Sequence, residues 1–84
     1  MTREIGVACD AILPNGEKIV AVERRVVAQA GCPGELMQPV LCLERLTSDG
    51  RPFVWHACLD AVVINQDGSE VVAMIDKASF RFVS

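Results

Sequence analysis

The chain lacks the residue patterns on which most catalytic and metal sites depend. It has one histidine, no tyrosine and no two cysteines in Cys-x-x-Cys spacing, although structural zinc sites are built mostly from such close pairs. It also has no Gly-x-Ser-x-Gly elbow and no phosphate-binding glycine loop followed by Lys-Ser or Lys-Thr. We therefore expect a protein that is not an enzyme and that holds no cofactor or metal ion.

Basic side chains and long apolar runs are also scarce. The 8 Lys and Arg residues against 11 Asp and Glu residues give a net charge of −3, which leaves no basic stripe for a phosphate backbone. No run approaches the ~18 apolar residues of a membrane helix. The residues after Met1 do not resemble a secretory signal, because Asp10 interrupts them. We expect a cytoplasmic protein that binds neither nucleic acid nor membrane.

The four cysteines are irregularly spaced, at Cys9, Cys32, Cys42 and Cys58, and match no secreted disulfide scaffold. Thiols stay reduced in the cytosol, where free cysteine commonly behaves as a small buried hydrophobic residue. We therefore expect four reduced thiols.

Three turn signals stand out, at Pro14-Asn15-Gly16, Ser48-Asp49-Gly50 and Gln66-Asp67-Gly68, each between runs rich in Val, Ile, Leu and Ala. Asn-Gly and Asp-Gly favour two-residue hairpin loops, because both positions of a type I′ turn require positive φ. The pattern predicts stacked β-hairpins within a single domain spanning residues 1–84.

A two-residue loop at Asn15-Gly16 would place Ile12 opposite Ile19 and thereby fix which side chains share a face. The face expected to line the core is Ile5, Val7, Cys9, Ala11, Val20, Val22 and Val26. Arg24 also falls on this face, which predicts a β-bulge within residues 23–25 that turns the arginine outward.

The same reasoning around Asp49-Gly50 places Leu43 opposite His56. Apolar residues alternate from Pro52 to Ile64, a longer stretch than a typical strand, which predicts a bend or a change of sheet near Leu59. The face expected to line the core here is Phe53, Trp55, Ala57, Leu59, Ala61 and Val63.

The opposite face of this second hairpin is too apolar to be covered by solvent alone. This expected interaction face is Leu41, Leu43, Val54, His56, Cys58 and Val62. A protein partner, or a second copy in a two-fold homodimer, would cover it.

His56, Cys58 and Asp60 alternate along one strand and so project from one side. Their Cα atoms would be ~6.6–6.8 Å apart, too far for a thiolate–imidazole–carboxylate relay. Zinc would need Cys42 or Asp60 as a further ligand beside His56 and Cys58. We expect neither a catalytic nor a metal site.

The segment 29–39 is rich in Gly and Pro, which predicts the longest loop of the chain. Leu36 and Met37 within it, together with Trp55, are candidates for a ligand-binding or loop edge. Residues 71–75 are predicted as a strand rather than a short helix because of their β-branched side chains. The alternation of Phe80 and Phe82 with polar residues predicts a terminal strand.

These elements predict an all-β fold of five to six antiparallel strands in meander order. It is either a small barrel, similar in general shape to SH3-like and Sm-like barrels, or a two-layer sandwich. The function expected is a non-enzymatic interaction module, adaptor-like or inhibitor-like, acting through an acidic, partly apolar sheet face. The alternative is a small-ligand-binding barrel whose mouth lies near Trp55, His56 and the 29–39 loop.

Overall fold

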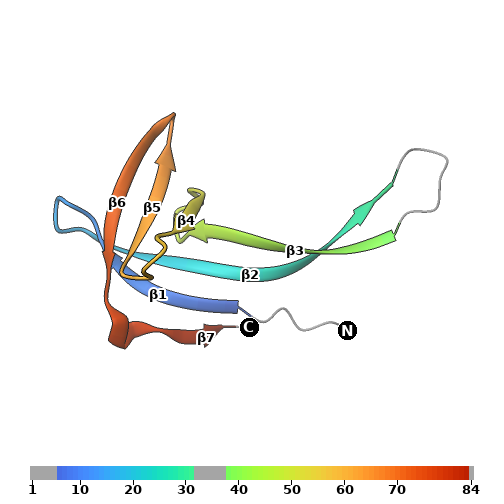
Figure 1. The fold of residues 1–84 in the computed structure, drawn as a ribbon, viewed down its shortest axis with the longest axis horizontal. Coiled ribbons are helices and arrows are strands. Elements are labelled where there is room, and N and C mark those ends of the chain that lie inside the picture. Colours follow the sequence, from blue (N-terminus) through green and yellow to red (C-terminus); the bar gives the residue numbers. More distant parts are fainter. Residues whose placement is uncertain (1–5, 32–37, 84) are drawn as a thin grey trace.

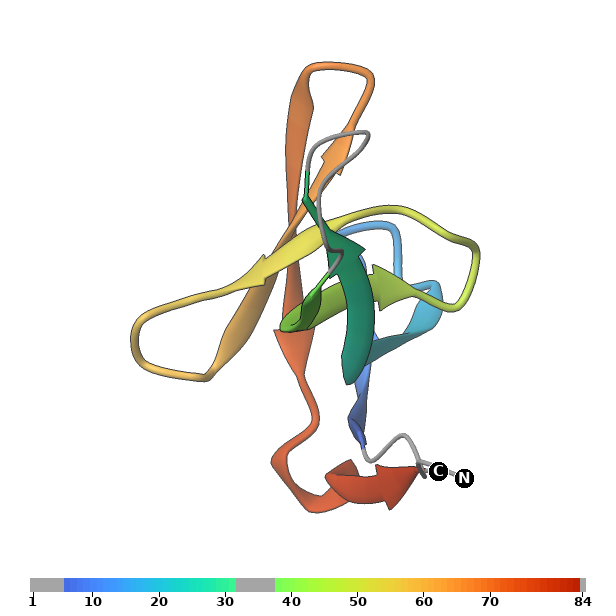
Figure 2. The ribbon, with the colours of Figure 1, turned by 90° about the vertical axis from the view of Figure 1, so that its right-hand side faces the viewer.

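The computed structural model describes residues 6–31 and 38–83, most of which form β-strands. The elements are β1 (Gly6–Ile12), β2 (Lys18–Ala30), β3 (Gln38–Thr47), β4 (Phe53–Trp55), β5 (Ala61–Gln66), β6 (Ser69–Ile75), a 3-10 helix η1 (Lys77–Ser79) and β7 (Arg81–Val83). The strand order is β3-β2-β1-β6-β5-β4, and a single bridge from Leu46 to Pro52 links the two ends. The result is a nearly closed antiparallel barrel in meander order (Figures 1 and 2), which confirms the expected fold.

Strand β1 pairs with β2 on one edge and with two different strands on the other. Ile12 pairs with Met74 of β6, while Gly6 pairs with Val83 of β7. Between these two pairings, the main-chain N of Asp10 donates to Ser79 Oγ at 2.7 Å. The strand predicted at 71–75 and the terminal strand are thus confirmed, and both are held against β1.

The loop between β5 and β6 is the two-residue turn that the sequence predicts. Gln66 pairs with Ser69 across it, and the two residues between them, Asp67 and Gly68, have φ of 50° and 82°. Positive φ at both central positions is typical of type I′ geometry.

The other two turns are one residue longer than predicted. Leu13 N donates to Glu17 O, and Gly16 N donates back to Leu13 O, both at 2.8 Å. Gly16 has φ 88°, the left-handed conformation that ends a three-residue hairpin loop built on a type I turn. The loop at 48–50 has the same arrangement, with Gly50 at φ 87°.

The extra loop residue shifts the β1–β2 register by one, and such a shift turns the other face of the strand to the core. Ile12 pairs with Lys18 instead of Ile19, and Cys9 pairs with Ala21. Cys9 and Ala11 are buried as expected. On β2, however, the buried residues are Ile19 and Ala21, so the expected core face of Val20, Val22 and Val26 was wrong.

The predicted β-bulge at residues 23–25 was also wrong. Strand β2 pairs in regular register with β1 up to Arg24 and with β3 along its outer half. In the observed register Arg24 lies on the face away from the core, so no bulge is needed to turn it outward.

The predicted strand from Pro52 to Ile64 divides into β4 and β5, which raises the number of strands to seven. Leu59 lies in the turn between them with φ 55° and a side chain that is 54 % exposed. Phe53 pairs with Ile64, and both side chains are buried. The expected change of direction near Leu59 is therefore present. Ala61 is buried as expected, but Ala57 and Leu59 are exposed, and Val62 and Ile64 are buried in place of Val63, so these parts of the expected core face were wrong.

The predicted 29–39 loop is shorter than expected, because β2 continues to Ala30 and β3 begins at Gln38. Pro39 pairs with Gln29 inside the β2–β3 ladder. Leu36 and Met37 lie outside the described residues.

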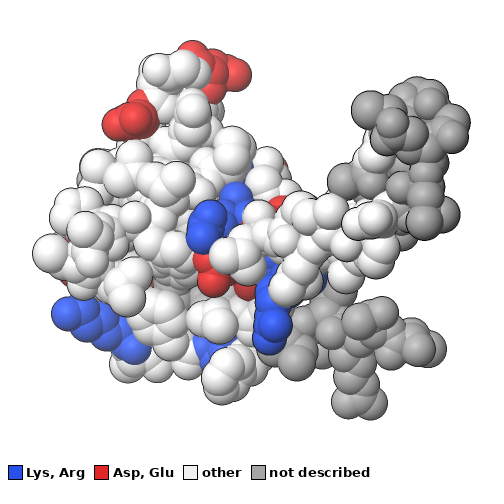
Figure 3. All heavy atoms as spheres, turned by 45° about the vertical axis from the view of Figure 1, so that its right-hand side comes forward, with Lys and Arg blue, Asp and Glu red and all other residues white. Residues whose placement is uncertain are grey.

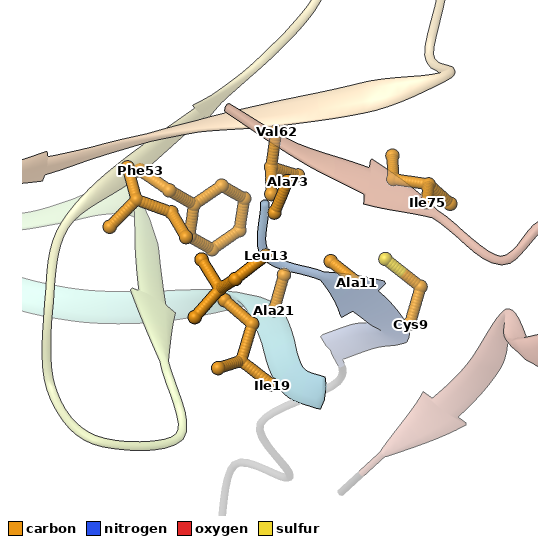
Figure 4. Packing of buried hydrophobic residues seen from close by; sticks show 10 residues of the cluster. Cys9, Ala11, Leu13, Ile19, Ala21, Phe53, Val62, Ala73 and Ile75 are labelled. Carbon is orange, nitrogen blue, oxygen red and sulfur yellow. The ribbon is translucent and has the colours of Figure 1, made fainter. Parts of the chain in front are cut away.

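The core fills the barrel where β1 and β2 face β4, β5 and β6 (Figure 4). Its members are Cys9, Ala11, Leu13, Ile19, Ala21, Phe53, Val62, Ile64, Ala73 and Ile75, with Trp55 and Val71 packed against it. Four of the ten are alanine or cysteine, whose small side chains let the strands of a narrow barrel approach closely. The few large side chains must therefore carry most of the packing energy.

Ile64→Ala should lower the free energy of unfolding by about 2–5 kcal/mol, because Ile64 has no exposed surface and its loss leaves a cavity. Ile12→Ala is the matched control, since Ile12 is 42 % exposed on the barrel exterior. Chemical denaturation of both variants measures the difference. Equal losses would contradict the assignment of the core.

Candidate functional site

The residues of the expected interaction face do not lie on one continuous surface. Leu41 and Leu43 belong to β3, which pairs with β2, whereas Val54 belongs to β4, which pairs with β5. β4 comes close to β3 at the barrel end of β3, where Leu46 is bridged to Pro52, and not along the part of β3 that carries Leu41 and Leu43. Val62 is fully buried in the core, so its place on that face was wrong. Leu41 and Leu43 are the members that stay together.

Leu41 and Leu43 lie on a two-stranded ribbon that projects from the barrel (Figure 1). We call this ribbon the outer arm and define it as residues 25–30 of β2 and 38–43 of β3. The molecule measures 49 Å along its longest axis against 30 and 23 Å along the others. The outer arm therefore extends beyond the core that stabilises the rest of the sheet.

Apolar side chains occupy both faces of the outer arm. Val27 pairs with Leu41 on one face, and Ala28 pairs with Val40 on the other. The exposed fractions are 54 % for Val27, 40 % for Val40, 61 % for Leu41 and 52 % for Leu43. A solvated ribbon would carry polar residues on at least one face, so the composition of this ribbon is typical of a surface that is covered.

Charged side chains gather where the outer arm joins the barrel. Arg25 is the one charged residue in its sequence, and Figure 3 shows the arm largely uncoloured with Lys, Arg, Asp and Glu at its base. Arg45 Nε donates to Glu23 Oε1 at 2.7 Å, and these residues are direct partners across β2 and β3. This ion pair marks the boundary between the barrel and the apolar ribbon.

Glu23 also joins the arm base to β4. Its Oε1 accepts a second hydrogen bond, from Trp55 Nε1 at 3.1 Å. The Trp55 ring packs edge-on against Phe53 with centroids 5.1 Å apart and lies 6.1 Å from the ring of Phe80. Trp55 is half-buried and closes this side of the core, so its indole N–H is already used within the fold.

The expected barrel mouth near Trp55, His56 and the 29–39 loop is not assembled. The described ends of that segment form the outer end of the arm, whereas Trp55 lies at the arm's base. A different hollow, of about 500 Å³, lies among the loops at 14–17 and 49–51 and the β5–β6 hairpin. Arg51 crosses it, bound to Asp49 at 2.9 Å and to Gln66 at 2.8 Å.

The Arg51 and Thr47 hydrogen bonds to Asp49 lower the pKa of this carboxyl group. These bonds close the 48–50 loop, since Arg51 N also donates to Thr47 Oγ1 at 3.0 Å. The polar groups around the hollow thus bond to one another and stabilise the turn.

His56 and Cys58 lie in the β4–β5 turn, where His56 Nδ1 is 3.3 Å from Asp60 Oδ1. The main-chain N of Cys58 approaches the same nitrogen at 3.4 Å. Both side chains of the His56–Asp60 pair are about half exposed. Within residues 6–31 and 38–83, no three His, Cys, Asp or Glu side chains lie close enough together to hold a metal ion.

The three described cysteines differ in their surroundings. Cys9 is buried in the core, Cys42 is half-buried on β3, and Cys58 is exposed. Burial raises the pKa of the Cys9 thiol, and the negative charge of Asp10 adds to that rise. Cys9 is therefore held as the neutral, unreactive thiol.

Comparison of the chain with known protein families, with curated proteins and with solved structures finds no match. In the part of the chain that the structure describes, no helix is long and apolar enough to cross a membrane.

Sequence reasoning missed the outer arm and the Glu23–Trp55 bond at its base. A signal for the arm was present, because no charged residue occurs between Arg25 and Glu35, a long gap for a strand that faces solvent on both sides. No local sequence pattern predicts the Glu23–Trp55 hydrogen bond, because the bond depends on the register of β2.

Glu23→Ala should lower the free energy of unfolding by about 1–2 kcal/mol, because the indole N–H and the Arg45 guanidinium both lose their acceptor. The fluorescence of Trp55, the single tryptophan, should shift to longer wavelength as water reaches its ring. Glu44→Ala, an exposed position on the same hairpin, should change neither quantity. Similar losses in both variants would contradict the bonding at the arm base.

Cys9 should resist alkylation in the native protein, since burial raises its pKa and blocks access. Cys58 should react readily with iodoacetamide at about pH 8, as an exposed thiol does. Peptide mapping before and after denaturation measures both sites. Native-state labelling of Cys9 at the rate of Cys58 would show that β1 does not bury this side chain.

Proposed function

We propose that this protein is a non-enzymatic interaction module whose contact surface is the outer arm. The observation that carries the proposal is the exposure of Val27, Val40, Leu41 and Leu43 on a ribbon without an underlying core. Small soluble domains rarely present such a continuous apolar surface unless something covers it.

The energetic case rests on these four side chains. Each is roughly half exposed, so covering it contributes about 1 kcal/mol of hydrophobic free energy. The ion pair between Arg45 and Glu23 at the base of the arm limits the apolar surface on the barrel side. Val27, Leu41 and Leu43 share one face and Val40 lies on the other, so a partner that covers the first face needs an apolar strip that matches these three side chains.

Binding of a small ligand at the barrel mouth finds less support. Trp55 Nε1 is bonded to Glu23, and the polar groups in the loop hollow bond to one another. The cytoplasmic compartment and the homodimer expected from the sequence stay predictions.

The double variant Leu41→Ser/Leu43→Ser tests the arm. It should weaken binding of a different protein about 30-fold, since covering these two side chains contributes about 2 kcal/mol in total. Self-association should weaken more, because both copies lose the two leucines. Stability should be unchanged, because both residues are more than half exposed. The matched control is Val72→Ser/Met74→Ser, which removes two exposed side chains at the same spacing from β6.

Self-association is measured by sedimentation velocity. Proteins retained from a lysate by the wild type are compared quantitatively with those retained by each variant. The proposal requires that association survive in the β6 variant and be lost in the arm variant. Equal retention by the arm variant and the wild type, in both measurements, would overturn it.

A further inference from the structure

Strand β3 has an open edge along the outer arm. It pairs with β2 on one side, and on the other side the described residues pair with it only at its barrel end, where Leu46 is bridged to Pro52 and Thr47 N donates to Arg51 O. Residues 40–43 of this edge are Val, Leu, Cys and Leu. They include none of the charged side chains, prolines or bulges with which exposed edges usually prevent pairing with another chain.

The direction of the free backbone groups follows from the β2–β3 ladder. Ser48 N donates to Val20 O, and the register continues without a bulge, so even-numbered residues of β3 bond to β2. The odd-numbered residues must point their N–H and C=O groups to the other edge. Thr47 agrees, since its N–H bonds to Arg51 O, away from β2. Leu41 and Leu43 therefore present their backbone groups to the open edge.

We infer that the partner at this edge is a second copy of the chain, whose β3 pairs antiparallel with β3 across a two-fold axis through Cys42. The inference rests on the proposed function and names its partner. In this register Leu41 of each copy lies opposite Leu43 of the other, and the two exchange both backbone hydrogen bonds. Cys42 lies opposite its own counterpart.

The side chains select this register over its neighbours. An axis through Leu43 would place Leu41 opposite Arg45, a side chain already bound to Glu23. An axis through Leu41 would place Leu43 opposite Pro39, which has no N–H to donate. The axis through Cys42 pairs leucine with leucine. Within each copy, Leu41 lies beside Val27 and Leu43 lies beside Arg25. On that face of the combined sheet the four leucines lie together, and each leucine pair has Val27 at one end and Arg25 at the other.

On the barrel side this pairing ends at Arg45, because Leu46 of each copy is already bridged to Pro52. Strand β3 runs from the end of the outer arm toward the barrel (Figure 1). In an antiparallel pair the two barrels therefore lie at opposite ends of the joined ribbons. Glu44 and Arg45 of each copy flank the apolar pairing and limit it to the arm.

Disulfide trapping at Cys42 tests the register. Directly opposed residues in a non-hydrogen-bonded pair have Cα atoms ~4.5 Å apart, within the range that a disulfide spans. The test protein carries Cys32→Ser and Cys58→Ser, which leaves Cys42 and the buried Cys9. It is oxidised with diamide at low protein concentration, and the covalent dimer is measured by intact mass after denaturation.

The matched control moves the thiol by two residues on the same face. It carries Cys42→Ser and Val40→Cys in the same background, and position 40 would lie opposite Glu44 of the other copy. Thiols juxtaposed in the dimer have an effective concentration in the millimolar range, so trapping at Cys42 should be at least ~10-fold faster than in the control at ~10 μM protein.

The outcomes distinguish failure of this inference from failure of the proposed function. Fast trapping at position 42 and not at position 40 supports the two-fold pairing. Trapping at position 40 alone, or equal rates at both, overturns the register. If neither traps while Leu41→Ser/Leu43→Ser still loses a different bound protein, the inference fails and the interaction module stands. If that variant loses nothing either, both fail.

Discussion

The hairpin between β1 and β2 depends on one backbone constraint, the positive φ of Gly16. Asn15 does not have the positive φ that a two-residue type I′ turn would require, so Gly16 closes a loop that is one residue longer. The extra residue places Ile19 and Ala21 in the core. By the same alternation, Glu23 lies on the face toward the core, where its carboxylate accepts from Trp55. The barrel interior and the base of the outer arm are thus set by the same loop.

The β2 strand connects the two parts of the molecule. Its first half pairs with β1 and packs against the core, while its second half pairs with β3 alone among the described residues. The alternation of side chains continues without interruption between them. Ala21 and Val27 lie on the same face of β2. This face lines the core at Ala21 and is exposed at Val27.

The all-β class, the turns and the meander order could be predicted, because Asn-Gly and Asp-Gly mark turns wherever they stand between apolar runs. Which face of each strand lines the core could not be predicted. Asn15-Gly16 and Asp49-Gly50 are each compatible with a two-residue or a three-residue loop. At Asn15-Gly16 the extra residue shifts the register by one and so exchanges the two faces of β2. Leu41 and Leu43 were chosen correctly as exposed apolar residues. Val62 was misplaced because the sequence indicates a bend near Leu59 but not that the turn between β4 and β5 exchanges the faces, so that Phe53 is buried before it and Val62 after it.

Pairing of Gly6 with Val83 joins residues from opposite ends of the described chain. During synthesis, the second edge of β1 stays unpaired until β6 and β7 have been made. The β2–β3 ribbon can pair as soon as both of its strands have been synthesised. Folding of a nascent chain therefore begins with local hairpins and ends with the closure of the barrel. Until that closure, one edge of β1 is open to pairing with neighbouring chains, and slow translation of the last strands prolongs that interval.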